Sequence, residues 1–331
     1  MKIGLSYDLK EAVRIRHNLP EDALEEYDSL ETVEAIAAAL EALGHTIVWL
    51  GGGKEFLSNI LQKRVDMVFN IAEGRGDFRS REAQIPCVLE MLDIPYSGSD
   101  PQCLAICLDK PLTKKLAATE GVSTPQWLVI TDIEQLQRIT WNGFAFPAVV
   151  KPSHEGSSKG IRSSNRVEHV RQAVDVVTDL LDRYQQPVLV EEFVAGDEVT
   201  VGVLGNSPPR VLGIMRVLPK IRTENFIYSL EVKRDWERLV EYECPAHLDG
   251  ITVQRITDAS LKIFDALGCR DFARVDFRVS AEGAPYFLEI NPLPGLNPRS
   301  SDLPLMACGM GLDFQELISE ILDSALQRYS Q

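Results

Sequence analysis

Residues 273–295 read ARVDFRVSAEGAPYFLEINPLPG and contain the two β-rich runs on which the fold assignment rests. The tetrapeptide AEGA (281–284) lies between the runs and predicts a β-hairpin with a four-residue loop. With Ser280 opposite Pro285, counting outward pairs Asp276 with Glu289 and Arg274 with Asn291. Because strand side chains alternate, these four lie on one face. The other face, predicted to be the core side, carries Val275, Phe277, Leu288 and Ile290.

The polar face of this hairpin has the composition of a metal site. Two carboxylates at opposed positions repel each other unless something positive lies between them, and Arg274 supplies part of that charge. Mg²⁺ prefers oxygen ligands such as those of Asp276, Glu289 and Asn291. The alternative is an exposed polar sheet face without a ligand. The next stretch, NPLPGLNPRS (291–300), is stiffened by three prolines, and its Gly295 N–H can approach a ligand closely.

Residues 151–160, KPSHEGSSKG, follow the apolar run FPAVV and present a second candidate site. Glycines and serines allow backbone N–H groups to converge on an anion, and Lys151 and Lys159 add positive charge. The segment matches neither GxxxxGK[ST] nor GxGxxG. Taken alone, it is also compatible with a flexible hairpin tip.

The N-terminal third predicts a parallel sheet. Strand-like runs at 2–8, 46–51 and 65–72 alternate with helical patterns at 28–44 and 54–62. Asp28 and Glu31 are predicted to cap the first helix, and Gly44 to end it. Ligands gather beyond the carboxyl ends of such strands, where the sequence places NIAEGRGDFRSREAQ (70–84). Candidates for contacting a charged substrate there are Arg75, Arg79, Arg81 and Glu82.

The chain divides into three predicted α/β segments. A Pro-, Gly- and Ser-rich break at 94–101 and the end of the strand-like run near 193 give boundaries at 1–98, 99–193 and 194–331. Helical patterns are predicted within 103–121, at 166–184 and at 251–268. Strands are predicted within 187–205, on either side of Gly196, and from 210 to 219.

Composition excludes several classes of partner. The 34 Lys and Arg against 49 Asp and Glu give a net charge of −15, which repels nucleic acid and anionic lipid surfaces. The N-terminus lacks a signal-peptide pattern, and no apolar run is long enough to span a bilayer, so we expect a cytoplasmic protein. The six cysteines lack CxxC pairing and predict buried reduced thiols rather than disulfides or zinc ligands.

Taken together, the motifs resemble those of the D-alanine:D-alanine ligase group of the ATP-grasp superfamily. The resemblance runs from about Gly74 to the C-terminus through LEMLDIPYSGS, LDK, KPSHEGSSKG, VLVEEFVAGDEVTV, ARVDF and LEINPLPG in the expected order. It implies an α/β fold of three domains, with an N-terminal parallel domain. The antiparallel sheets of the central and C-terminal domains would enclose ATP.

The resemblance implies a role for each matching residue. Lys110, Lys151 and Lys233 correspond to phosphate-binding lysines, and Glu155, Ser157 and Ser158 to the loop that closes over the phosphates, Ser157 also counting as catalytic. Glu191, Glu192, Phe193 and Val194 correspond to the adenine-reading segment, and Glu198 to the ribose-binding glutamate. Asp276, Glu289 and Asn291 correspond to ligands of two magnesium ions, with manganese as the alternative. Arg274 and the Gly295 N–H correspond to the oxyanion hole.

The implied chemistry joins a small carboxylate to a small amine. The carboxylate attacks the γ-phosphate of ATP to give an acyl phosphate, and the amine then attacks that carbonyl. Lysines and magnesium are needed because two anions must approach each other. The family also implies a homodimer.

The N-terminal half departs from the family pattern. The family's glycine-rich motif, whose glutamate binds the substrate ammonium, is replaced by a segment at 7–31, and the HGxxGEDGxxQG motif becomes AEGRGDFRSREAQ. A tyrosine expected after Lys233 is Arg234, and PRSSDLP (298–304) replaces the serine-leucine after the oxyanion glycine. We therefore expect altered amino-acid or small-carboxylate substrates. The candidate substrate residues are Asp8, Glu31, Glu73, Arg79, Arg81, Arg234, Ser300 and Ser301.

Three alternatives stay open. The first is an authentic D-alanine:D-alanine ligase of peptidoglycan synthesis with a divergent N-terminus. The second is phosphorylation without ligation, against which the retained Arg274 and Gly295 argue, since a kinase needs no oxyanion hole for a carbonyl adduct. The third is a non-catalytic nucleotide-binding module, against which the intact lysines and metal ligands argue.

Overall fold

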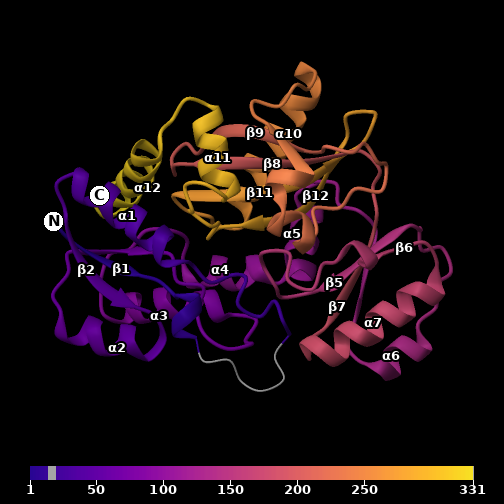
Figure 1. The fold of residues 1–331 in the computed structure, drawn as a ribbon, viewed down its shortest axis with the longest axis horizontal. Helices are drawn as coiled ribbons and strands as arrows, with labels where there is room; N and C mark the ends of the chain where they lie inside the picture. The colour runs from indigo at the N-terminus through magenta and orange to yellow at the C-terminus, as the bar shows by residue number, and fades with distance from the viewer. Residues whose placement is uncertain (14–19, 331) are drawn as a thin grey trace.

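The computed structural model describes residues 1–13 and 20–330 and contains three β-sheets (Figure 1). The first sheet is formed by the N-terminal part of the chain, drawn in indigo and violet at one side. The middle and C-terminal parts of the chain form the other two sheets. Within the described residues, no helix combines the length and the apolar character needed to cross a bilayer. The mixed α/β fold class is confirmed.

The first sheet is parallel, as the sequence predicts. Its strand order is β2-β1-β3, and both neighbours pair with β1 in parallel. The elements of this part are β1 (Lys2–Ser6), η1 (Lys10–Ala12), α1 (Leu30–Ala42), β2 (Thr46–Gly51), α2 (Gly53–Gln62), β3 (Met67–Asn70), η2 (Arg81–Ala83) and α3 (Gln84–Met91). Gly44 follows the end of α1 with φ +85°, so its predicted role as a helix stop is confirmed.

The predicted cap of α1 is wrong by one residue. The Ser29 side chain, not that of Asp28, accepts the Thr32 N–H and forms the N-cap. Asp28 instead belongs to the preceding segment, where its N–H donates to the Asp8 carbonyl. Removal from water, and then the neighbouring Asp8 carboxylate, raise the pKa of Asp28 to about 7.

The second sheet is antiparallel and has the order β4-β7-β5-β6. Its apolar cluster includes Val150, Val190 and Val177, which pack β5, β7 and α7 together. The elements are α4 (Pro101–Leu108), α5 (Lys110–Thr119), β4 (Trp127–Ile130), α6 (Ile133–Arg138), β5 (Ala148–Pro152), η3 (Ser163–Asn165), β6 (Arg166–Val167), α7 (Val170–Tyr184) and β7 (Val188–Glu192). The strand β5, which lies within the run FPAVVKP (146–152), leads directly into the rest of the KPSHEGSSKG segment.

The third sheet is antiparallel and has the order β10-β9-β8-β11-β12. Its elements are β8 (Asp197–Leu204), β9 (Arg210–Pro219), α8 (Leu230–Arg234), α9 (Trp236–Leu239), β10 (Val240–Glu243), α10 (Gly250–Ala266), β11 (Phe272–Val279), β12 (Pro285–Asn291), α11 (Asp302–Gly309) and α12 (Phe314–Tyr329). The strands predicted on either side of Gly196 belong to different sheets, since β7 lies in the second and β8 in the third.

The hairpin register is correct at the site and shifted at the turn. Asp276 pairs with Glu289 and Arg274 with Asn291, as predicted. A bulge after Asp276 makes Val279, rather than Ser280, the partner of Pro285. The prediction that Leu288 faces the core is wrong for the same reason. Because of the bulge, Phe287 is buried in the core and Leu288 faces the cleft between the sheets.

The C-terminal helix returns to the first sheet. In Figure 1, α12 lies beside α1, and one apolar cluster joins residues of both helices, including Ile36 and Ile321, with Ile3 of β1. The predicted boundaries at 98 and 193 fall between α3 and α4 and just after β7. The division of the chain into three domains at these boundaries remains a prediction.

The raised pKa of Asp28 predicts a pH-dependent effect of Asp28→Asn. Between about pH 4 and about pH 7, Asp28 is protonated in the folded protein and ionised in the unfolded chain. The free energy of unfolding therefore falls as pH rises through this range. Asparagine cannot ionise, so the variant should gain stability over the parent at pH 8 and gain less at pH 5. Urea unfolding at both pH values measures the gain, with the exposed Glu34→Gln as control. Equal gains at the two pH values would contradict the assignment.

Candidate functional site

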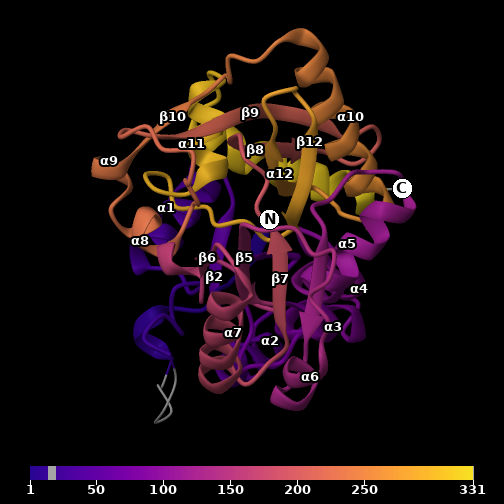
Figure 2. The same ribbon diagram turned by 90° about the vertical axis from the view of Figure 1, so that its right-hand side faces the viewer.

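A cleft between the two antiparallel sheets holds most of the residues that the sequence assigns to nucleotide binding. Figure 2 shows the strands β5 and β7 below β8, β9 and β12. Two adjoining pockets in this cleft share Lys151, Ile161, Glu198, Tyr228 and Leu288. The first also contains Ser158, Lys233, Asp276, Glu289 and Asp302, and the second Glu191, Glu192, Phe193, Val194, Ile227 and Arg278.

The strand end at 191–194 is fixed from both sides. The Phe193 ring lies between two guanidinium groups, 4.6 Å from Arg166 and 4.7 Å from Arg278. Arg278 also donates to the carbonyl oxygens of Val194 (3.0 Å) and Gly196 (2.8 Å). The segment therefore presents a rigid backbone edge to the second pocket.

The Glu191 side chain takes part in a buried lysine cluster. Its carboxylate pairs with Lys114 and lies 2.8 Å from the Lys151 Nζ. Burial alone would raise the pKa of Glu191, but these two lysines lower it. The carboxylate is thus held by lysines, and the backbone at 191–194 is left to line the pocket.

Glu198 lies where the two pockets meet. Its carboxylate accepts a hydrogen bond from Arg278 at 2.8 Å. Burial raises the pKa of Glu198 despite this guanidinium. Leu288, brought to the same face by the bulge, supplies an apolar surface beside it. An apolar wall with a carboxylate at its end suits a flat base joined to a sugar hydroxyl.

The paired carboxylates of β11 and β12 are surrounded by cations from distant parts of the chain. The Glu289 Oε2 lies 3.1 Å from the Lys110 Nζ at the start of α5. Asp276 accepts hydrogen bonds from Arg274 (2.7 Å) and from the Thr200 hydroxyl (2.6 Å) on β8. The like charges at opposed positions are compensated in this way.

These surroundings shift the pKa values of the groups in the first pocket. Burial alone would raise the pKa of Glu289, but Lys110 and Lys151 lower it well below its usual range. Burial, followed by the nearby Arg274, lowers the pKa of Lys233. Glu289 is thus ionised at neutral pH, which a metal ligand requires.

The oxygens at this site fit Mg²⁺. Asp276 and Glu289 face one pocket from opposed positions, and Asn291 pairs with Arg274 one step along the same face. The Asn291 Oδ1 accepts the Leu293 N–H at 2.8 Å, which orients the amide and leaves a second lone pair. A hard cation takes two or three such oxygens and completes its shell with water or phosphate.

Arg274 lies beside the carboxylate pair, and Gly295 lies in the loop that follows β12. Arg274 NH1 is 3.5 Å from the Asp302 carboxylate, at the start of α11. A Cβ at position 295 would meet the Ser301 hydroxyl at 2.8 Å, so this close approach favours glycine. The Ser301 hydroxyl in turn accepts the Asn297 N–H and holds the loop in shape.

The loop after β5 is the wall between the nucleotide cleft and a second cavity. Ser158 and Lys151 line the cleft, whereas Glu155 and Lys159 line the cavity. Ser157 and Ser158 have φ values of +49° and +57°, in the left-handed region that non-glycine residues rarely occupy. The structure therefore places Glu155 on the far side of the loop from the nucleotide cleft, while Ser157 is exposed.

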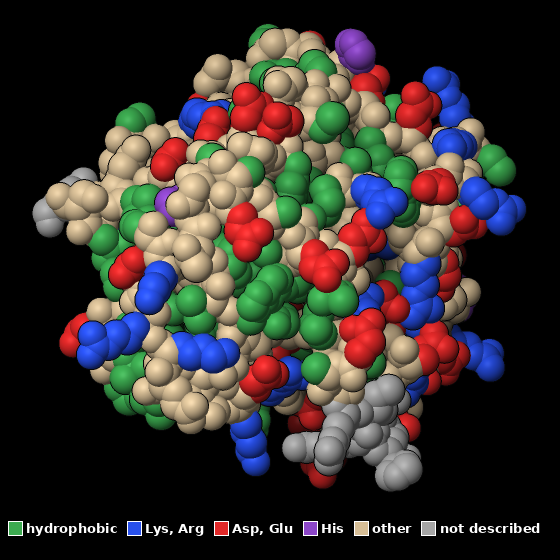
Figure 3. All heavy atoms as spheres, turned by 60° about the vertical axis from the view of Figure 1, so that its left-hand side comes forward, with side chains coloured by type: hydrophobic (Ala, Val, Ile, Leu, Met, Phe, Trp, Pro, Cys, Tyr) green, Lys and Arg blue, Asp and Glu red, His purple; other side chains and the backbone are tan. Residues whose placement is uncertain are grey.

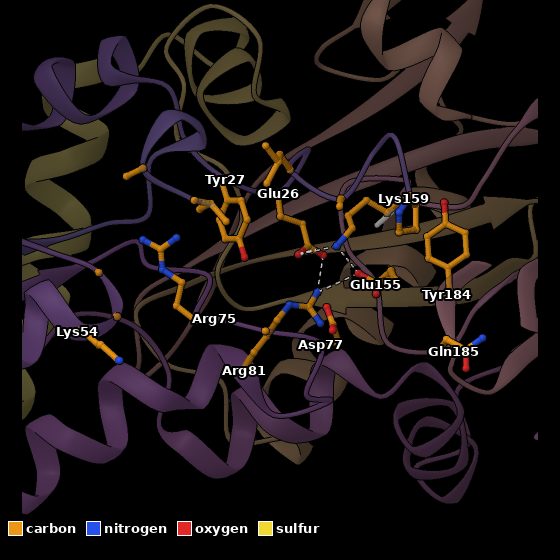
Figure 4. Close-up of a pocket in the computed structure, with 18 of the residues that line it drawn as sticks. Glu26, Tyr27, Lys54, Arg75, Asp77, Arg81, Glu155, Lys159, Tyr184 and Gln185 are labelled. Atoms are coloured by element: carbon orange, nitrogen blue, oxygen red, sulfur yellow. Dashed lines mark hydrogen bonds and ion pairs between the residues drawn. The ribbon is translucent and has the colours of Figure 1, made fainter. Parts of the chain in front are cut away.

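The second cavity has a volume of about 760 Å³ and mixed charge, within the size range of small-molecule sites. The close-up in Figure 4 shows the side chains that line it. Its wall includes Glu26, Tyr27, Gly52, Lys54, Arg75, Asp77, Arg81, Glu155, Lys159 and Tyr184. Residues from the N-terminal segment, from 75–81 and from the loop at 153–160 thus meet in one place. We call this loop the phosphate loop, after the role that its sequence predicts.

An ion cluster at the cavity wall joins these three segments. The Glu26 carboxylate accepts from Arg81 NH2 (2.5 Å) and from the Gly156 N–H (2.6 Å), and lies 3.2 Å from the Lys159 Nζ. Glu155 closes the cluster at 3.3 Å from Arg81 and 2.5 Å from Lys159 (Figure 4). The phosphate loop is therefore anchored through its own backbone.

The charges of the cluster are balanced. Burial alone would raise the pKa of Glu26, but Arg81 and Lys159 lower it to about 2. Burial alone would lower the pKa of Arg81, but Glu26 and Glu155 raise it. Both side chains are consequently charged at neutral pH.

Further carboxylates of the N-terminal segment hold the same loop. The buried Asp22 accepts the Gly160 N–H at 2.9 Å and the Tyr184 hydroxyl at 2.8 Å. Glu25, in the same segment, accepts a hydrogen bond from Arg234 of α8 at 2.5 Å. Of the segment at 7–31 that replaces the family motif, residues 14–19 lie outside the described residues.

The remaining predicted substrate residues divide into two groups. Asp8 lies 2.8 Å from the Arg75 Nε beside the cavity, and burial, followed by Glu82, raises the pKa of the neighbouring Glu73. The others lie outside the cavity wall and the cleft: Glu31 pairs with Arg299, Arg79 is 73% exposed, and Ser300 is exposed. Thus Arg81 belongs to the cluster, Asp8 and Glu73 lie near it, and Arg234 pairs with Glu25 outside the cavity wall.

Sequence reasoning missed several of these residues. Glu26 lies in the acidic run EDALEEYD (21–28), which resembles an ordinary solvated segment. Thr200 and Asp302 also carry no motif. Arg278 had a usable signal, because it continues the alternation of Arg274 and Asp276 on the ligand face of β11.

The outer surface near the N-terminal part has mixed charge. In Figure 3, Lys and Arg side chains are interspersed with Asp and Glu, and a group of hydrophobic side chains lies between them. No large field of one sign covers the drawn face, apart from atoms hidden by the grey residues.

The chain is similar to known proteins over most of its length. Residues 116–323 match the family model described as "D-ala D-ala ligase C-terminus". A D-alanine–D-alanine ligase from Aquifex aeolicus is 37% identical over 89% of this chain and 94% of its own length. An uncharacterized protein, y4sG, from Sinorhizobium fredii is 33% identical over 89% of this chain and 88% of its own length.

Solved structures share the fold. A D-alanine–D-alanine ligase from Bacillus anthracis complexed with ATP superposes with a TM-score of 0.76 at 24% identity, covering 100% of this chain and 99% of that one. A D-Ala:D-Ser ligase from Enterococcus faecalis gives 0.73 at 22% identity, covering 98% and 99%. Since the family model and the Aquifex relative span most of the sequence, the chain belongs to the D-alanine–D-alanine ligase family of the ATP-grasp superfamily.

Proposed function

We propose that this protein is an ATP-dependent carboxylate–amine ligase whose substrates differ from a pair of D-alanines. The observation that carries the proposal is the phosphate loop shared by two sites. The nucleotide cleft lies on one side of the loop and the charged cavity on the other. A substrate carboxylate in the cavity can thus approach a phosphate in the cleft.

The residues of the cleft have complementary roles in this proposal. Lys110, Lys151 and Lys233 neutralise phosphate charge, and Asp276, Glu289 and Asn291 hold magnesium. Bound Mg²⁺ would polarise the transferring phosphoryl group. Arg274 lies beside these carboxylates, and in this proposal its guanidinium and the N–H of Gly295, in the loop after β12, donate to a developing oxyanion.

The cavity supports altered substrates. In place of the single family glutamate, its wall carries the buried cluster of Glu26, Arg81, Glu155 and Lys159. The Gly52–Gly53 end carries Lys54, Arg75 with its partner Asp8, and Glu55, so it offers ion-pair partners for both the carboxylate and the ammonium of an amino acid. The competing proposal, an authentic D-alanine–D-alanine ligase, is favoured by the names of several relatives.

A screen of phosphate release tests the substrate proposal. We expect turnover with pairs that contain an amino acid or small carboxylate other than D-alanine, and weak turnover with D-alanine alone. The screen pairs D- and L-amino acids and small carboxylates in the presence of ATP and magnesium. Robust turnover with D-alanine alone would establish the competing function.

Glu289→Gln tests the magnesium assignment. The amide keeps the size of the side chain but removes the charge beside Lys110, so we expect kcat/KM to fall about 100-fold or more. The apparent affinity for Mg²⁺ should fall with it. Glu282→Gln, on the exposed turn of the same hairpin, is the matched control. Parental turnover and Mg²⁺ dependence in Glu289→Gln would rule the assignment out.

Glu26→Gln tests the anchoring of the phosphate loop. The change removes a charge that Arg81 and Lys159 share, so we expect kcat/KM to fall about tenfold or more. Steady-state kinetics measures the loss, and thermal unfolding separates it from a general loss of stability. The exposed Glu41→Gln on α1 is the control. If both variants keep parental kinetics, the cluster has no role in turnover.

A further inference from the structure

Three cysteine side chains meet in the apolar core behind the nucleotide cleft. Cys103 and Cys107 lie one turn apart on α4, and Cys269 lies just before β11. The Cys103 Sγ is 3.8 Å from the Cys107 Sγ and 3.5 Å from the Cys269 Sγ. All three are buried, with exposures of 1%, 4% and 7%. Sequence spacing does not reveal this set, because Cys269 is 166 residues from Cys103 and only the fold brings it close.

The sulfur positions match a coordination shell. Zinc–sulfur bonds of about 2.3 Å in a tetrahedral site place neighbouring sulfurs about 3.8 Å apart. The three Sγ atoms all lie within 4.8 Å of one another, so one ion can reach all three with small side-chain movements. Among the described residues, no other set of three or more His, Cys, Asp and Glu ligand atoms meets this distance limit.

Hydrogen bonds next to the thiols fix the two segments that carry them. The Arg270 N–H donates to the Ser99 hydroxyl at 2.9 Å, and the Arg270 guanidinium lies 2.7 Å from Asp100. The Gly98 N–H donates to the buried Asp271 carboxylate at 2.7 Å. The distance between α4 and the start of β11 is therefore set without any bond between sulfurs. Such outer contacts preorganise metal ligands.

We propose that Cys103, Cys107 and Cys269 bind one thiophilic metal ion, zinc(II) or copper(I), as thiolates. Soft sulfur ligands select these ions and disfavour magnesium and calcium. Each coordinating thiol releases its proton on binding. None of the three cysteines lines the nucleotide cleft or the charged cavity. The ion therefore joins α4 to the start of β11 and takes no part in the reaction that joins the substrates. This proposal departs from the expectation of metal-free thiols drawn from the sequence.

The metal content of the purified full-length protein tests the proposal. After expression in medium supplemented with zinc or with copper, elemental analysis should find about one ion per chain, and the ion found identifies the preferred metal. Refolding with cobalt(II) should give a thiolate-to-cobalt charge-transfer absorption. The protein should melt at a higher temperature with the ion than after its removal.

Single substitutions locate the ion. Cys107→Ala should lose the metal and the cobalt absorption, whereas Cys87→Ala and Cys308→Ala, at exposed cysteines, should keep both. Less than about a tenth of an ion per chain, with no cobalt absorption in the parent, would overturn the proposal. A disulfide between Cys103 and Cys269, seen by mass spectrometry without reduction, would overturn it as well. If Cys107→Ala fails to fold, these measurements on the parent decide alone.

Discussion

The opposed carboxylates of β11 and β12 impose the strongest constraint on this structure. Asp276 and Glu289 repel each other in a partly buried position, and a chain with this pair must bring cations to it. Lys110 comes from α5, Lys151 from β5 and Lys233 from α8, while Arg274 lies beside the pair on β11 itself. The charge requirement thus ties the two antiparallel sheets to each other around the cleft.

A second charge cluster repeats this logic on the other side of the phosphate loop. Glu26 and Glu155 are matched by Arg81 and Lys159, which come from different parts of the chain. Breaking such a buried set by removing one member leaves an uncompensated charge. The loop therefore lies between two neutralised clusters, and its position depends on the N-terminal segment as well as on the sheet that carries it.

Local rules predicted the parts of the structure that local chemistry determines. Alternation placed the four polar residues on one face, and apolar runs located the parallel sheet. The predicted pairing of Asp276 with Glu289 holds because two departures cancel: the loop is one residue longer than predicted, and the bulge restores the register. The bulge that turns Leu288 to the cleft has no local signal, since it arises from pairing between strands. Glu26 and the three cysteines were missed for a related reason. Arg81 is 55 residues from Glu26, and Cys269 is 166 residues from Cys103, so only the tertiary fold brings these groups together.

The backbone conformation of the two serines in the phosphate loop limits the use of this loop in other proteins. Ser157 and Ser158 stand in succession in the left-handed region, at a cost on the order of 1–3 kcal/mol each. The carboxylates of Glu26 and Asp22 hold the flanking amides of Gly156 and Gly160 and compensate for that strain. The loop sequence is therefore not a portable module. Grafted onto another scaffold without an acidic segment opposite it, the loop would relax to a different shape.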